Sequence, residues 1–146
     1  MELIEGFGTQ HIALLASALL LGSMVFFSFI VLPKLRKALD PEIARTLITR
    51  LFVVYYAYCA SLAMVAGVAI AFGARPFDAG AMAITGACFI FARTHLLPAI
   101  RRAQKRREIN PRDQRAFRAL HLISVLLNLA QIVVVAWVVI RFLPTT

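Results

Sequence analysis

Charged residues are scarce in this chain and almost missing from four long stretches. Only 16% of the 146 residues are charged and 61% are apolar, which is far from the composition of an ordinary soluble domain. The stretches are residues 12–33, 51–74, 79–100 and 122–140. Only the third contains ionisable side chains of Arg or His, namely Arg93 and His95. Because about 20 apolar residues cross the hydrocarbon of a bilayer, the pattern predicts four transmembrane helices and excludes a soluble domain.

Cysteine is rare, and basic residues near the N-terminus and catalytic sets are lacking. Cys59 and Cys88 both fall inside predicted spans, so we expect free thiols and no disulfide framework. The opening "MELIEGFG" has no Lys or Arg, so we expect no cleavable signal peptide and a retained first span. No Ser/His/Asp set or carboxylate pair occurs in one compartment, so no catalytic residue is assigned.

The formal net charge of +9 is concentrated on one side of the predicted membrane. Basic residues gather in two loops, residues 34–50 and 101–118, whereas the other side has only Arg75 and Arg141. This positive-inside pattern predicts cytoplasmic loops and two periplasmic termini in a bacterial inner membrane. The loops are expected to contact anionic lipid headgroups, and nucleic acid is not expected as a partner.

The two basic loops share a pattern. "LPKLRKALDPEIAR" begins at Leu32 and "LPAIRRAQKRREINPRDQR" begins at Leu97. In both, Asp or Asn precedes Pro, so Asp40 and Asn110 are predicted N-caps of the following helices. We therefore predict an all-α, four-helix transmembrane bundle with N-out/C-out topology, made of two parallel-repeat helical hairpins. It forms a single domain, 1–146, with helices near residues 9–33, 41–74, 79–104 and 111–142, and its small-residue faces are compatible with a homodimer.

Hydrogen-bonding side chains form a row on the fourth predicted helix. His121, Ser124, Asn128 and Gln131 are spaced by three, four and three residues, which places them on one helix face. Lipid offers no hydrogen-bonding partner, so the row should face the bundle interior. Ser124 and Gln131 are interpreted as contacts between helices, His121 as a ligand, and Asn128 as either.

The third predicted helix supplies a second candidate group. If the third and fourth helices are neighbours, His95 can approach His121. Arg93 either extends to the headgroups or pairs with an anionic ligand, since no acidic residue lies in a predicted span. On the second helix, Cys59 is a candidate soft ligand and Tyr55 a supporting residue.

Metal or haem ligation is the chemistry that these residues allow. Two imidazoles across a bundle suit haem b, and an imidazole with a thiol suits copper. His11 is a further candidate ligand, but it lies too far from His121 for both to hold one small ion. The sequence has no Cys-x-x-Cys-His, no His-x-x-x-His and no Glu within a span.

Several short segments together resemble a known family. His11, Gly22-Ser23, "RLFVVYY" from Arg50, Ala92-Arg93 before Pro98, and Phe117 with His121, Ser124 and Asn128 are similar to the transmembrane protein 205-like family. Val53 stands where that family often has Pro, which removes the reason to expect a kink there. The family is similar in layout to CopD-like copper-resistance proteins and HemJ-type proteins of haem synthesis. The resemblance implies handling of a metal, a metal complex or a porphyrin.

The sequence therefore favours a small membrane protein that binds or transports a metal, a metal complex or a haem-like ligand inside the bundle. A haem-binding membrane redox enzyme acting on porphyrins is the first alternative. A ligand-free assembly or scaffold subunit is the second.

Overall fold

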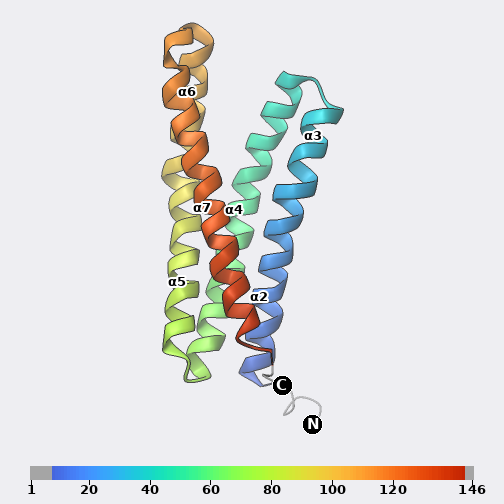
Figure 1. The fold of residues 1–146 in the computed structure, drawn as a ribbon, viewed down its shortest axis with the longest axis vertical. Helices are drawn as coiled ribbons and strands as arrows, with labels where there is room; N and C mark the ends of the chain where they lie inside the picture. Colours follow the sequence, from blue (N-terminus) through green and yellow to red (C-terminus); the bar gives the residue numbers. More distant parts are fainter. Residues whose placement is uncertain (1–7, 144–146) are drawn as a thin grey trace.

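The computed structural model describes residues 8–143, and this part of the chain is helical with no strand. Four continuous helical segments, here called rods, are long and apolar enough to cross a membrane (Figure 1). In chain order they are Thr9–Ala38, Pro41–Phe72, Pro76–Ile109 and Pro111–Ile140. The predicted all-α transmembrane bundle is confirmed. The segments are α2 (Thr9–Phe26), η1 (Phe27–Val31), α3 (Leu32–Ala38), α4 (Pro41–Phe72), α5 (Pro76–Phe91), η2 (Ala92–Leu96), α6 (Leu97–Ile109), η3 (Pro111–Asp113) and α7 (Gln114–Ile140).

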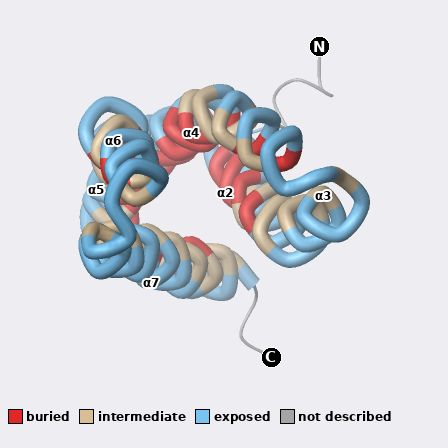
Figure 2. Tube along the Cα trace, turned by 90° about the horizontal axis from the view of Figure 1, so that it is seen from above, coloured by how far each residue is buried: buried red, intermediate tan, exposed pale blue. Residues whose placement is uncertain are grey.

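The helices form two hairpins that pack side by side. Around the bundle α2 contacts α4, α4 contacts α5, α5 contacts α7, and α7 returns to α2 (Figure 2). The start of α2 and the end of α7 lie at one end of the bundle. The turn between α3 and α4 and the turn between α6 and α7 lie at the other end, where the two hairpins diverge. Both basic segments therefore lie at the same end of the bundle, which is called the diverging end below.

The first and third rods continue past their Leu-Pro sequences, beyond the predicted ends at residues 33 and 104. Immediately before Leu32-Pro33 and Leu97-Pro98 lie the five-residue π-helical segments η1 and η2. Proline has no N–H and its ring clashes with the carbonyl four residues earlier, and a wider π turn relieves that conflict without ending the helix. The same device occurs at corresponding places in both hairpins. α4, which has Val53 in place of Pro, runs uninterrupted.

The basic segments are mostly helical and do not form extended loops. Only a short turn separates α3 from α4, and the 3₁₀ turn η3 leads into α7. The Asn110 side chain caps this turn by accepting a hydrogen bond from the Arg112 N–H at 3.2 Å. Asp40 occupies the N-cap position of α4, but its carboxylate makes no capping bond. Both residues therefore occupy the predicted N-cap positions, and of the two only Asn110 makes a side-chain capping bond.

The core combines close helix contacts with an aromatic cluster. A Cβ added at Gly86 of α5 would lie 3.5 Å from the Cβ of Ala63 in α4, so these helices approach closely. Nearer the diverging end, the Tyr55 ring stacks on Phe27 with centroids 4.2 Å apart, and Phe89 meets Tyr55 edge-on at 6.3 Å. This cluster fills the bundle centre directly beneath the region where the hairpins separate.

One buried acidic side chain lies at the start of a membrane-length helix. α5 begins at Pro76, earlier than the predicted residue 79, so Asp78 lies in its first turn and is buried. Arg75 Nη2 lies 2.8 Å from Asp78 Oδ2, and Arg141 Nη1 lies 3.5 Å from Oδ1. This ion-pair group joins the α4–α5 turn to the end of α7.

Candidate functional site

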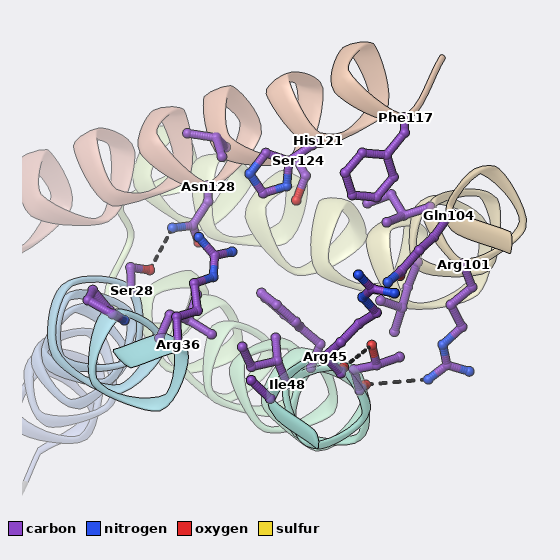
Figure 3. A pocket seen from close by; sticks show the side chains of 18 of the residues that line it. Ser28, Arg36, Arg45, Ile48, Arg101, Gln104, Phe117, His121, Ser124 and Asn128 are labelled. Carbon is purple, nitrogen blue, oxygen red and sulfur yellow. Dashed lines mark hydrogen bonds between the residues drawn. The ribbon is translucent and has the colours of Figure 1, made fainter. Parts of the chain in front are cut away.

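A cavity of about 600 Å³ opens between the hairpins at the diverging end. Its walls come from η1 and α3, the first half of α4, α6, and the first half of α7. Figure 3 shows His121, Ser124 and Asn128 of α7 projecting toward the same space as Arg36 of α3. Most of the lining side chains are apolar: Phe29, Leu32, Pro33, Pro41, Ala44, Ile48, Phe52, Leu97, Ile100, Phe117, Val125 and Leu129. The volume is within the range of small-molecule sites, about 300–1,000 Å³.

A hydrogen-bonded group forms the floor of the cavity. Asn128 Nδ2 donates to Ser28 Oγ at 2.8 Å, and the Tyr55 hydroxyl donates to Asn128 Oδ1 at 3.4 Å. Asn128 thereby joins α7 to η1 and α4. From Asn128 to Phe117 near the mouth, eleven residues of helix correspond to a depth of about 16 Å.

Four arginines line the cavity, namely Arg36, Arg45, Arg101 and Arg107. None of the described residues that line it is acidic. Three of the four contact other protein groups near the mouth of the cavity. Arg45 pairs with Glu108, Arg101 Nη2 donates to the Thr49 carbonyl at 3.4 Å, and the Arg107 guanidinium lies over the Phe117 ring at 4.4 Å. The cavity therefore has an apolar body and a cationic entrance.

Arg36 is the exception among these arginines. Within the part of the chain that the structure describes, its guanidinium has no hydrogen-bond or ion-pair partner. Figure 3 shows its side chain extending from α3 toward Asn128 and His121 of α7. It is thus the cation best placed to meet an anion inside the cavity.

The row on α7 is divided between two environments. His121, Ser124 and Asn128 line the cavity. The His121 ring stacks with Phe117, with centroids 6.1 Å apart and an interplanar angle of 9°. Gln131, one turn deeper, is buried and donates to the Thr85 carbonyl of α5 at 3.3 Å.

The structure does not bring the other predicted ligands into this cavity. His95 and Arg93 lie on η2, are exposed, and are not among the lining residues. The His95 ring stacks on Phe91, and its Nδ1 lies 2.7 Å from the Thr94 hydroxyl oxygen. The predicted approach of His95 to His121 inside the bundle is therefore not found in the cavity.

Cys59 and His11 also lie elsewhere. Cys59 is fully buried in the aromatic core, outside the cavity lining. His11 lies in the first turn of α2, at the opposite end of the bundle. Across residues 8–143, no three His, Cys, Asp or Glu side chains gather as a metal-ion site.

The lining arginines were missed because the sequence assigned them to loops. Arg45, Ile48 and Phe52 on α4, and Leu97, Arg101 and Gln104 on α6, follow three- and four-residue steps that continue an apolar helix face. That spacing places Arg45 and Arg101 on the same helix faces as the apolar lining residues once these basic segments are taken as helices and not as loops.

Comparison with known proteins identifies a family but no characterised relative. A family model described as "Domain of unknown function (DUF4149)" matches residues 15–109. This range runs from α2 through the end of α6 and stops before α7. No curated protein and no solved structure matches the chain. Because the family match covers more than half of the sequence, the protein belongs to the DUF4149 family.

Proposed function

We propose that this membrane protein binds, or carries across its bundle, an amphipathic anion with an apolar body and a carboxylate or phosphate group. The observation that carries the proposal is the apolar cavity lined by four arginines and by no acidic residue among the described ones. An apolar solute gains about 25 cal/mol for each Å² that it buries, and an anion at a partly desolvated guanidinium gains a charge-assisted hydrogen bond. Neither the apolar lining nor the arginines would stabilise a metal cation without an organic ligand.

The two ends of such a ligand would have separate partners. The apolar body would lie against Phe52, Ile100 and Val125, and the anionic group would meet the unpaired Arg36. Asn128 and Ser124 would supply hydrogen bonds near the floor. Because Asn128 is held by Ser28 and Tyr55, its position is set before the ligand arrives, which lowers the entropy cost of binding.

Haem and related lipophilic metal complexes belong to this ligand class. His121 would hold the iron and Arg36 would pair with a propionate, and bound haem would supply one-electron redox chemistry. His95 is not in the cavity, so a second imidazole is not provided there. Copper held by His121 with Cys59 has less support, because Cys59 lies in the packed core. The resemblance to the transmembrane protein 205-like family supports a metal complex or porphyrin over a simple fatty acid.

Ferric haem and a fluorescent fatty acid are suitable probes of the purified protein. Arg36→Gln is expected to weaken binding of both probes by about tenfold or more, since a hydrogen bond to a charged group is worth about 1.5–3 kcal/mol. His121→Ala is expected to change the Soret band of bound haem and to leave fatty-acid binding nearly intact. Arg93→Gln and His95→Ala are matched controls on η2.

Two results would contradict the proposal. One is that neither probe binds to the folded wild-type protein. The other is that the η2 controls reduce binding as much as Arg36→Gln and His121→Ala do, because the cavity would then not be the site.

A membrane redox enzyme acting on porphyrins is the second candidate. The observation in its favour is the His121 imidazole inside a cavity of sufficient volume. It requires that bound haem change oxidation state during turnover of a porphyrin substrate. Unchanged porphyrin after incubation with the haem-loaded protein and an electron acceptor would favour simple binding or transport.

We further propose that the diverging end faces the cytoplasm of a bacterium and that both termini are periplasmic. The concentration of Lys and Arg at that end supports this orientation under the positive-inside rule. Reporter fusions at each basic turn would test it.

A further inference from the structure

A second, shallower groove lies on the bundle between α4 and α6, next to the cavity. Its volume is about 390 Å³. Arg50 is the last charged residue before the apolar stretch at 51–74, and Arg101 is the first after the stretch at 79–100. The groove therefore lies at the boundary between the charged end of the bundle and its apolar belt.

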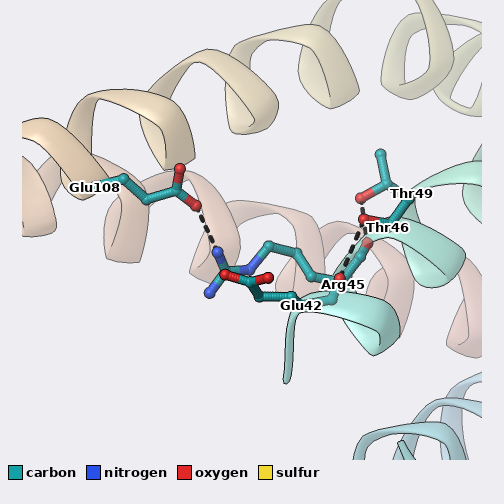
Figure 4. A network of polar contacts seen from close by, with 5 residues as sticks. All are labelled: Glu42, Arg45, Thr46, Thr49 and Glu108. Carbon is teal, nitrogen blue, oxygen red and sulfur yellow. Dashed lines mark hydrogen bonds and ion pairs between the residues drawn. The ribbon is translucent and has the colours of Figure 1, made fainter. Parts of the chain in front are cut away.

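The groove carries excess positive charge. Arg45, Arg50, Arg101 and Lys105 line it, and Glu108 is the acidic residue among the described lining residues. Figure 4 shows Arg45 of α4 reaching across to Glu108 of α6, and the two form an ion pair. This pair neutralises the carboxylate and leaves the other cations uncompensated.

Most N–H groups of Arg50, Arg101 and Lys105 make no hydrogen bond to the described part of the chain. Arg101 uses one nitrogen on the Thr49 carbonyl. Arg50 and Lys105 make no hydrogen bond or ion pair with any residue between 8 and 143. Three cations with available N–H groups thus line one groove.

Apolar surface continues from the groove toward the membrane centre. Val54, one turn beyond Arg50 on α4, is 67% exposed. In a membrane, this surface faces acyl chains. A ligand whose anionic group enters the groove while its apolar part follows α4 would match both features.

We propose that this groove binds the phosphate headgroup of an anionic phospholipid from the surrounding leaflet. The phosphate would contact Arg50, Arg101 and Lys105, and an acyl chain would lie against Val54. Basic sites between membrane helices at the cytoplasmic surface are suited to such headgroups. The apolar surface favours a lipid over free phosphate, because only a lipid also covers Val54. The groove shares Arg45, Thr49, Arg101 and Gln104 with the cavity lining, whereas Arg50 and Lys105 line the groove alone. The lipid proposal does not depend on which ligand the cavity binds.

The chain offers variants that separate the two sites. Arg50 and Lys105 line the groove and not the cavity, whereas Arg36 and Arg107 line the cavity and not the groove. Arg112 and Arg115, near the α6–α7 turn, line neither. Arg50→Ala with Lys105→Ala can therefore be compared with Arg112→Ala with Arg115→Ala, which removes the same amount of charge.

Native mass spectrometry of the purified protein would measure retention of added phosphatidylglycerol and phosphatidylcholine. The wild type is expected to retain one phosphatidylglycerol more tightly than phosphatidylcholine. The groove pair of substitutions is expected to weaken that retention by about tenfold or more, and the control pair by much less. Thermal unfolding would verify that both variants are folded.

Equal losses in the two double variants would overturn the proposal, because net charge alone would then explain binding. Displacement of the lipid by inorganic phosphate at a matched concentration would also overturn it, in favour of a soluble anion. An effect of Arg36→Gln on the cavity probes, with lipid retention unchanged, is expected if both proposals hold. Failure of the cavity probes alone would leave the lipid site supported.

Discussion

Replacing Arg75 with Leu is expected to destabilise the protein much more than replacing Arg141 with Leu. Asp78 is only 1% exposed, and the Arg75 guanidinium, 24% exposed, lies 2.8 Å from its Oδ2. Arg141 is 43% exposed and lies 3.5 Å from Oδ1. Arg75 also donates to the Arg141 carbonyl at 3.2 Å and covers the Phe142 ring. Arg75 is therefore the principal partner of a buried carboxylate.

The structure sets the size of each effect. Breaking a buried ion pair so that one charge stays buried costs about 3–5 kcal/mol. Arg141 remains as a weaker partner after Arg75→Leu, so about 2–3 kcal/mol is expected. The more exposed contact with Arg141 should contribute about 1 kcal/mol or less. Arg75→Leu combined with Asp78→Leu leaves no buried charge and should regain most of the lost stability.

Trp137 provides a local signal for this experiment. It is the single tryptophan of the chain, it packs edge-on against Phe77 with centroids 5.9 Å apart, and it lies 4.7 Å from the Arg141 guanidinium. Unfolding in detergent can therefore be followed by Trp137 fluorescence and, for the whole bundle, by circular dichroism. Equal costs for the two arginine variants, or a double variant less stable than Arg75→Leu, would refute the reasoning.

Two further predictions concern backbone and packing. Ala74 has φ of 58°, which is unfavourable for a residue with a side chain, so Ala74→Gly should raise the free energy of unfolding by about 1 kcal/mol. No gain in thermal unfolding would contradict this. Gly86→Val should destabilise by about 1–3 kcal/mol through overpacking against Ala63. Gly22→Val is the matched control, since a Cβ there meets nothing within 4 Å, and equal losses would rule out the packing argument.

The transmembrane architecture was predictable because lipid imposes a strict condition on the chain. Backbone groups and charges cannot be satisfied by hydrocarbon, so the apolar stretches had to be helices and the cations other than Arg93 lie outside them. The Leu-Pro positions were less informative. A proline ends most helices, but at Pro33 and Pro98 the preceding π-helical segments let the helix continue. Most of α3, and the part of α6 beyond residue 104, therefore lay outside the predicted helices.

The cavity-lining residues could be predicted from the sequence on α7, but not on the segment that contains η2. α7 is regular, so the three- and four-residue steps place His121, Ser124 and Asn128 on one side, and these residues line the cavity. Arg93 and His95 fall within η2 itself. There the 3.6-residue period does not hold, and neither side chain is among those that line the cavity.

The sequence by itself determined which segments enter the membrane, which end of the bundle is basic, and which polar residues share a face of α7. These follow from local composition and from the helical period. Only the tertiary structure decided that Arg36, and not Arg93, approaches His121, and that Asp78 is buried between two arginines. Such encounters depend on helix rotation, on π-helical segments and on the divergence of the hairpins, which arise from packing between segments far apart in the chain.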